Sequence, residues 1–517
     1  MPDFRRILRS PARLSQYALM AITSLCLLGY LTSCWDFITY PFSLEYGEGH
    51  IAYLSRILKH THDLRALYPP FSQAPYIHTP YPPVFFVLHA LGLELFPDLN
   101  PFISGRLISL AALTVTLGAT FTFIRRLTGR SLYAWLSLLG FLSSYPFLLW
   151  GLLSRVDILA LMWTALGITF YLTSSRLTGK CLGMLCLVAA LFTKQTFFLA
   201  PLLLMTVEFI SRRRPKNWYL PGLVFMIFSC GTFLILNQMT GGRFVDHTIA
   251  ANALHTRHWD LTIYGFLYLL TSAVPLLPLF IWYCALKQKT VALYLRRDPV
   301  TAFCLLYPVF SLLVSAVYMG KAGSSTNHSI ETTFASLLSL SLLSRLSGIH
   351  LSSALPRIPL IPRKHYRLLA FGLMTVCMVY LYLGSQITLS HHFTTMQQDL
   401  PAYRLLLDRI ESSHGPFLSD DPSWAPLTEK TEYLMDPFGL MQLIEHGLFD
   451  PSPILFRLQD KTIKLILLSD SCQTENSQAR PDAGRMNEGL CQAITSNYHK
   501  EASTSDDSWP QHLWIPD

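Results

Sequence analysis

Long apolar runs recur through the first three quarters of this chain, and they constrain its fold more than any other feature. Runs rich in Leu, Phe, Ile, Ala and Val extend from Tyr17 to Gly384 and are scarce afterwards. A helix of about 20 apolar residues is long enough to cross a bilayer. Only 14% of the 517 residues are charged, whereas soluble chains carry about a quarter. We therefore predict a polytopic α-helical membrane protein with a soluble tail.

The formal net charge of +8 arises from short basic clusters between the apolar runs, such as 125–130 and 212–216. Loops on the cytoplasmic side of a membrane carry such clusters. The charge therefore indicates topology and argues against a nucleic-acid partner. Four arginines precede the first run, and no small-residue cleavage site follows it. This pattern predicts an uncleaved signal anchor with a cytoplasmic N-terminus.

Placing every basic cluster inside predicts eleven spans. Nine are expected at about 17–35, 101–124, 131–150, 155–175, 217–237, 261–285, 299–318, 329–345 and 367–388. The other two are halves of a re-entrant pair within 181–210, since a single span there would put the 212–216 cluster outside. The pair turns at Thr193–Gln195. Each half reaches only about 20 Å, so Lys194 is submerged and must face a polar cavity or a partner.

This topology divides the chain into a membrane domain, 1–388, and an extracytoplasmic tail, 389–517. The first outer loop, 36–100, contains an amphipathic stretch at 46–59, a Pro-rich stretch at 68–83 and a short apolar stretch at 84–96 that we expect in the interface. In the tail, helix-like stretches (403–412, 439–446) and strand-like stretches (416–418, 463–468) predict a small α/β domain. A disulfide between its two cysteines, Cys472 and Cys491, would fit an oxidising compartment.

Charged residues gather at the outer ends of the predicted spans. They are Glu45, Glu48, Arg106, Arg155, Asp157, Lys194, Lys321 and Glu331. Charges near a membrane core are costly and usually serve function. A carboxylate can take the proton of an acceptor, and cations can hold a departing phosphate. Transfer from a lipid phosphate requires both kinds of group.

Simpler interpretations stand beside this one. Glu45 and Glu48 could be solvated carboxylates on an interfacial helix, and Arg106 and Arg155 could snorkel from span ends. Lys194 is the hardest to explain in this way because the short helices leave it submerged.

Metal binding has little support in the sequence. His247, His255 and His258 share one outer loop, but their spacing matches no zinc pattern. We interpret them as solvated or interfacial histidines. No cofactor is predicted, although Asp157 could support a divalent metal.

Several segments together resemble the GT-C superfamily of membrane glycosyltransferases, in particular bacterial glycosyltransferase family 39-like proteins, relatives of protein O-mannosyltransferases and aminoarabinose transferases. The segments are Glu45–His50 (acidic motif), Tyr81–Phe86 (Pro-Pro motif), Ser154–Asp157 (second outer loop), Leu191–Gln195 (re-entrant turn), Gly323–His328 with Glu331 (late outer loop) and Asp436–Phe438 in the tail.

The resemblance implies an inverting transferase that moves a sugar from a polyprenyl-phosphate carrier to a glycan, lipid or protein acceptor outside the bacterial inner membrane. Glu48 matches the catalytic base best and Glu45 second, and Asp157 would position the acceptor. The substrate-binding residues would be Tyr81, Arg106, Arg155, Lys194, Gln195, Lys321, His328 and Glu331.

Two other functions remain open on the sequence. A transporter or lipid flippase would show internal repeats and broken helices with polar sites near the midplane, and no repeat is visible here. A non-catalytic assembly partner would carry the same fold with a degenerate site.

Overall fold

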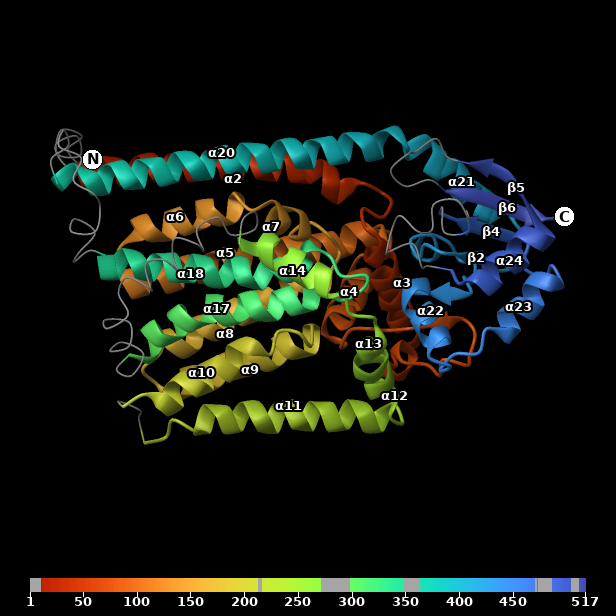
Figure 1. Cartoon of the computed structure of the whole chain (residues 1–517), viewed down its shortest axis with the longest axis horizontal. Helices are drawn as coiled ribbons and strands as arrows, with labels where there is room; N and C mark the ends of the chain where they lie inside the picture. Colours follow the sequence, from red (N-terminus) through yellow and green to blue (C-terminus); the bar gives the residue numbers. More distant parts are fainter. Residues whose placement is uncertain are drawn as a thin grey trace.

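The computed structural model describes residues 11–212, 216–270, 298–347, 363–469, 472, 486–503 and 511–517. Long helices lie side by side in a bundle, and the tail forms a separate mass at one end of it (Figure 1). A layer containing α3, α4, α12 and α13 lies between the bundle and the tail. This layer comes from the first outer loop and from residues 243–254.

Six helices of the described residues are long and apolar enough to cross a membrane. They are α2 (Pro11–Thr39), α5 (Pro101–Thr128), α8 (Val156–Thr173), α11 (Leu220–Met239), α17 (Pro299–Met319) and α20 (Arg363–Gln398). The six corresponding predicted helices are confirmed, and α18 (Ser329–Ser347) occupies the segment predicted at 329–345. In Figure 1, α20 runs beside α2 along one edge of the bundle.

The two short helices predicted within 181–210 are present as α9 (Leu177–Thr193) and α10 (Leu199–Ile210), which confirms the break at Lys194. Their re-entrant placement in a membrane stays a prediction. The continuous helix predicted at 131–150 is wrong. The segment forms α6 (Ser131–Leu142) and a six-residue α7 (Tyr145–Trp150). Pro146 has no N–H to bond the Leu142 carbonyl, and its ring would clash with that carbonyl in a continuous helix, so α6 ends at Leu142 and Pro146 lies in the first turn of α7.

The predicted span at 261–285 begins as α14 (Trp259–Tyr268), and its part beyond residue 270 lies outside the described residues. The total of eleven spans stays a prediction.

The first outer loop is mostly ordered into short elements. They are α3 (Tyr46–Thr61), η1 (Leu64–Leu67), β1 (Tyr76–Ile77) and α4 (Val84–Leu95). The second part of the intermediate layer consists of α12 (Arg243–Val245), η2 (Asp246–Ala250) and α13 (Ala251–Leu254). Because α3 begins at Tyr46, the acidic motif lies at a helix N-terminus.

The tail contains helices and a four-stranded sheet in the order β2-β4-β6-β5. Its helices are α21 (Leu400–Ser412), η5 (Ala425–Leu427), α22 (Pro437–Glu445), α23 (Ser452–Gln459) and α24 (Glu488–Asn497). The strands of this sheet are β2 (Phe417–Ser419), β4 (Leu465–Leu468), β5 (Tyr498–Ser503) and β6 (His512–Pro516). The strand β2 runs parallel to β4, and the other two pairings are antiparallel. A disulfide joins Cys472 to Cys491, the pair that the sequence left open.

The tail is attached to the first outer loop through the backbone. Strand β3 (Leu434–Met435) of the tail pairs in parallel with β1 of that loop. On α3, a Cβ at Gly49 would lie 2.4 Å from Ser423 Cα of the tail, so only glycine allows this approach. The two parts therefore share one interface, and the tail lies directly over the acidic motif.

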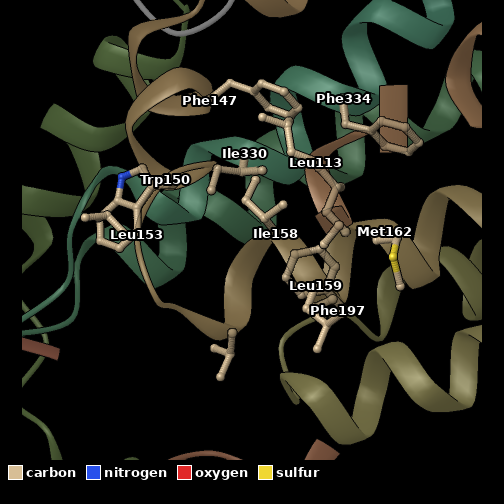
Figure 2. Packing of buried hydrophobic residues seen from close by; sticks show 14 of the residues in the cluster. Leu113, Phe147, Trp150, Leu153, Ile158, Leu159, Met162, Phe197, Ile330 and Phe334 are labelled. Carbon is tan, nitrogen blue, oxygen red and sulfur yellow. The ribbon is translucent and has the colours of Figure 1, made fainter. Parts of the chain in front are cut away.

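A packed apolar core supports the second outer loop, 151–155. Figure 2 shows Phe147 and Trp150 of α7 gathered with Ile158 and Leu159 of α8, and with side chains from α5 and α18. All four of these residues are at most 2% exposed. Such close packing leaves little freedom, so the short loop between α7 and α8 is held in one position.

Candidate active site

Of the two glutamates in the acidic motif, Glu45 is the one with an accessible side chain. Its backbone is extended, and its Oε2 accepts a hydrogen bond from the Gly47 N–H at 2.9 Å, which caps α3. The same oxygen lies 3.2 Å from Arg155 Nη1, and 30% of the side chain is exposed. Burial raises the pKa of Glu45, and the charge of Arg155 partly opposes that rise. The carboxylate is accessible and can accept a proton closer to neutral pH than an ordinary glutamate.

Glu48 and Arg106 instead form a closed structural pair. Glu48 Oε1 accepts from Arg106 Nε at 3.0 Å and from the Ser154 N–H at 2.6 Å, and Oε2 accepts from Arg106 Nη2 and the Leu44 N–H, both at 2.7 Å. The remaining Arg106 donors bond to three carbonyls within 37–42. Both side chains are 0% exposed. The predicted roles of Glu48 as base and Arg106 as phosphate ligand do not fit this geometry, because no donor or acceptor remains free.

Arg155 connects the acidic motif to the membrane helices. Besides Glu45, its guanidinium contacts the Tyr81 hydroxyl, to which Nη2 donates at 2.9 Å, and lies 5.6 Å from the ring centres of Tyr81 and Trp150. Its Nε is 3.9 Å from Asp157 Oδ2. The neighbouring carboxylates outweigh burial and raise the pKa of Arg155. The structure thus brings Tyr81, Arg155 and Glu45 into contact.

Gly47 makes room for this arginine. A Cβ at Gly47 would lie 1.1 Å from Arg155 Nη1, so any side chain there would displace the guanidinium. The sequence analysis did not single out Gly47. The sequence signal that could have identified Gly47 is its position, two residues after Glu45 and in the first turn of the predicted amphipathic stretch.

Lys194 forms a buried ion pair with Asp157. It ends α9, and its Nζ donates to Asp157 Oδ1 at 2.5 Å. Asn327 Nδ2 donates to the same oxygen at 3.1 Å. The Lys194 side chain is 4% exposed and that of Asp157 is 1% exposed. Asp157, in the first turn of α8, therefore compensates the charge of Lys194 and fixes the orientation of its side chain.

The late outer loop completes this group. His328 and Glu331 border a narrow space that Lys194 also lines. Glu331 Oε1 accepts from the Tyr307 hydroxyl at 2.8 Å, and the His328 ring stacks on Tyr318 with 5.3 Å between ring centres. Both predicted residues thus lie beside Lys194.

Lys321 and Gln195 bond to the 243–254 segment. Lys321 Nζ donates to Asn252 Oδ1 at 3.2 Å, and burial lowers the pKa of Lys321 to about 8. Gln195 Nε2 donates to the carbonyls of Pro80 and Thr248 at 2.8 and 3.0 Å. Gln195 therefore ties the re-entrant turn to the Pro-rich stretch through its Nε2. Its Oε1 is buried with no hydrogen-bond partner among the described residues, and its contact with substrate stays a prediction.

The structure adds a histidine–carboxylate pair that the sequence analysis did not place at the site. His78 Nδ1 lies 2.6 Å from Asp436 Oδ2, and His78 Nε2 lies 3.2 Å from the His247 carbonyl. A carbonyl only accepts, so Nε2 carries a proton. The Tyr46 hydroxyl lies 3.3 Å from Asp436 Oδ1. Asp436 of the tail thus contacts two residues of the first outer loop, His78 and Tyr46, and Tyr46 is next to Glu45. His78 and Asp436 are 358 positions apart in the sequence.

His247 differs from the prediction of a solvated or interfacial histidine. It is 0% exposed, its Nδ1 accepts from the Thr79 N–H at 3.0 Å, and its Nε2 donates to the Pro69 carbonyl at 2.7 Å. Within the described part of the chain, no group of three or more His, Cys, Asp or Glu side chains is arranged to hold a metal ion.

A cavity of about 780 Å³ lies between the bundle and the tail. Its walls come from residues 40–46, from Tyr145–Leu153, from 323–326, from the end of α20 with Asp399 and Tyr403, and from Asp421, Ser423, Trp424 and Phe438 of the tail. Glu45 is the only described acid of the first outer loop that lines this cavity.

Solved structures resemble the whole chain. ArnT from Cupriavidus metallidurans, an aminoarabinose transferase crystallised with undecaprenyl phosphate, gives a TM-score of 0.62 at 13% identity, covering 96% of this chain and 98% of ArnT. The archaeal oligosaccharyltransferase AglB from Archaeoglobus fulgidus, in complex with an inhibitory peptide and a dolichol-phosphate, gives 0.51 at 11% identity, covering 94% and 72%. Both are GT-C proteins. The chain has the GT-C fold.

This finding confirms the resemblance inferred from scattered motifs. Comparison with protein-family models and with curated proteins gives no match. At 13% identity the likeness to ArnT shows the fold alone. Activity has to be argued from the residues of this GT-C-fold chain.

Proposed function

We propose that this protein is an integral membrane glycosyltransferase that moves a sugar from a polyprenyl-phosphate carrier to an acceptor hydroxyl. The observation that carries the proposal is the place of Glu45. It is a carboxylate with a raised pKa, 30% exposed in a large cavity and held by an arginine that also contacts Asp157. ArnT, whose fold is the same, was crystallised with undecaprenyl phosphate.

The reaction can be written from these groups. Glu45 takes the proton of the acceptor hydroxyl, and the acceptor oxygen attacks the anomeric carbon of the sugar. The bond from that carbon to the phosphate oxygen breaks, and its electron pair leaves with the polyprenyl phosphate. Attack opposite the leaving group inverts the anomeric centre. Glu45 afterwards releases its proton to water.

Arg155 and Lys194 are the cations nearest to this chemistry. Arg155 contacts Glu45 directly. Arg155 also lies near Asp157, and Asp157 in turn pairs with Lys194. Cations in a site that excludes water stabilise a developing phosphate charge strongly. Asp157 is a positioning residue in this scheme, since it is buried and holds Lys194.

The distribution of basic residues indicates on which side of the membrane the reaction takes place. The cavity is lined by residues of both the bundle and the tail. The tail lies at one end of the bundle (Figure 1), and the positive-inside assignment puts this end outside the cytoplasm. We therefore place the reaction at the extracytoplasmic face of a bacterial inner membrane.

The test uses purified full-length protein in liposomes containing the polar lipids and glycans of the cells that make it. Release of undecaprenyl phosphate, followed by mass spectrometry, reports transfer whichever sugar is carried. Removing a general base typically slows a reaction about 10²–10⁴-fold, so Glu45→Gln should abolish release. Glu429→Gln, at a side chain that is 94% exposed, is the matched control.

Retained activity in Glu45→Gln would exclude this base. A chain that moves lipid-linked sugar across the liposome without releasing undecaprenyl phosphate would be a transporter or flippase.

A further inference from the structure

Trp150, the last residue of α7, contacts both the apolar core and the candidate active site. Its ring is 2% exposed and lies at the margin of the apolar cluster shown in Figure 2. The centre of the same ring lies 5.6 Å from Arg155 Cζ. A guanidinium over the face of an indole, within about 6 Å of its centre, is attracted by the electrons of the ring. Trp150 therefore contacts the cation that pairs with Glu45, in addition to filling space in the core.

A hydrogen bond to the late outer loop holds the edge of this ring. Trp150 Nε1 donates to Thr326 Oγ1 at 3.0 Å, and Thr326 begins the short helix η4 (Thr326–His328). The next residue, Asn327, donates to Asp157 Oδ1 at 3.1 Å. Two consecutive residues of η4 thus contact two neighbours of the guanidinium. Because the ring is packed on the core and bonded at its N–H, it has little freedom to turn away from that group.

The Arg155 guanidinium lies between two carboxylates and contacts only one of them closely. Its Nη1 is 3.2 Å from Glu45 Oε2, whereas its Nε is 3.9 Å from Asp157 Oδ2. This Nε and this Oδ2 are both buried, and neither has a hydrogen-bond partner among the described residues. A buried donor or acceptor without a partner is costly, so a guanidinium that was free to move would shift toward Asp157 and satisfy both atoms. Other contacts must hold it beside Glu45.

We propose that Trp150 is a positioning residue whose ring keeps the Arg155 guanidinium beside Glu45 and away from Asp157. The Tyr81 hydroxyl assists, since it accepts from Nη2 at 2.9 Å, and burial raises the pKa of Tyr81 to about 12, so this group stays neutral. The role of Trp150 in sugar transfer rests on the proposed function, because that function makes Glu45 the base. The contact between the ring and the guanidinium does not depend on it.

The protonation of Glu45 reports where the guanidinium lies. Burial raises the pKa of Glu45, the Arg155 charge lowers it, the Glu48 and Asp157 charges raise it, and the Gly47 N–H lowers it. If the guanidinium moves toward Asp157, the cation is lost from the side of Glu45, and the pKa of Glu45 rises. An adjacent opposite charge lowers the pKa of a carboxyl by about 1–3, so the midpoint of Glu45 protonation should move upward by about one pH unit.

The experiment labels Glu45 with dicyclohexylcarbodiimide, which reacts with carboxyl groups in their protonated form. Full-length protein in detergent micelles is labelled at a series of values from about pH 4 to about pH 8, on both sides of a raised glutamate midpoint. Tandem mass spectrometry assigns the label to Glu45, and Glu45→Gln gives the background. Trp150→Leu should raise the labelling midpoint by about one pH unit, and Trp150→Phe, which keeps an aromatic face, should raise it less. Trp259→Leu, at a tryptophan that is 78% exposed, is the matched control and should leave the midpoint unchanged.

A second variant tests the same contact without removing the ring. Thr326→Val deletes only the hydrogen bond that holds the edge of Trp150, and it should also raise the midpoint; it decides the question if Trp150→Leu does not fold. An unchanged or lowered midpoint in the folded variant would overturn the inference.

Transfer is measured separately from labelling. The acid limb of undecaprenyl phosphate release should follow the labelling midpoint in each variant. Raised labelling midpoints, together with a wild-type protein that releases no undecaprenyl phosphate, would count against the glycosyltransferase proposal and leave the placement of Arg155 by Trp150 supported.

Discussion

Replacing Glu45 and Glu48 separately should show that Glu45 is needed for catalysis and Glu48 for the stability of the fold. In wild-type protein, Glu48 accepts four hydrogen bonds, two from Arg106 and two from backbone N–H groups. In Glu48→Gln, one carboxylate oxygen becomes an NH₂ group that faces donors. Two of the four bonds are lost, and the buried Arg106 keeps an uncompensated charge. Breaking a fully buried ion pair from one side costs about 3–5 kcal/mol.

That loss is large beside the total stability of a domain, about 5–15 kcal/mol. Glu45→Gln should behave differently. Its pair with Arg155 is partly exposed, and such pairs contribute about 0–1 kcal/mol. Glu45→Gln should therefore unfold close to wild type and lose undecaprenyl phosphate release, whereas Glu48→Gln should lose thermal stability first.

The assay is thermal unfolding in detergent micelles, read together with the yield of monodisperse protein, with Glu429→Gln as the exposed control. A second experiment measures the thermal stability of Glu48→Leu, of Arg106→Met and of the double variant that carries both changes. If the two groups stabilise each other, the double variant loses less stability than the sum of the single ones. A Glu48→Gln protein that unfolds like wild type but transfers no sugar would refute the reasoning and return Glu48 to the role of base.

Three further outcomes follow from individual contacts. Gly47→Ala should lower transfer at least about tenfold with little change in expression, because the new Cβ displaces the Arg155 guanidinium; unchanged transfer would mean that Arg155 is not needed there. Asp436→Asn should slow transfer and increase protease cleavage of the first outer loop, because it weakens the bond to His78, and equal protection of both proteins would contradict this. Wild-type activity should fall as the pH rises through about 8, where Lys321 loses its proton, and Lys321→Arg should remain active at about pH 9; identical profiles would exclude Lys321 from binding phosphate.

The acid side of the pH profile reports on Glu45. Its pKa is raised, so the neutral form persists to higher pH than for an ordinary glutamate at about 4.3. Transfer should decline on acidification with a midpoint above that value. Because the Arg155 charge lowers this pKa, Arg155→Gln should shift the midpoint further upward, and a downward shift would contradict the assigned pairing.

Periodicity and charge placement were sufficient to predict the helices of the membrane part. Apolar length alone located α2, α5, α8, α11 and α17, because a bilayer imposes one length on every helix that crosses it. The positive-inside rule placed the re-entrant turn at Lys194, since any other assignment would have moved a basic cluster outside. The break after α6 was missed because apolar residues continue across Pro146.

What the sequence could not decide was how the charges of the site pair. Glu45 and Glu48 are three residues apart on one motif, yet one lines a cavity and the other is enclosed by Arg106. Arg106 and Arg155 are equivalent as snorkelling candidates, and only the packing of α5 and α8 gives them different partners. Asp436 was out of reach for a similar reason, because its contact with His78 depends on how the tail lies on the first outer loop. Local pattern determines which helices form, but electrostatic partners depend on contacts between distant segments, and those exist only once the chain has folded.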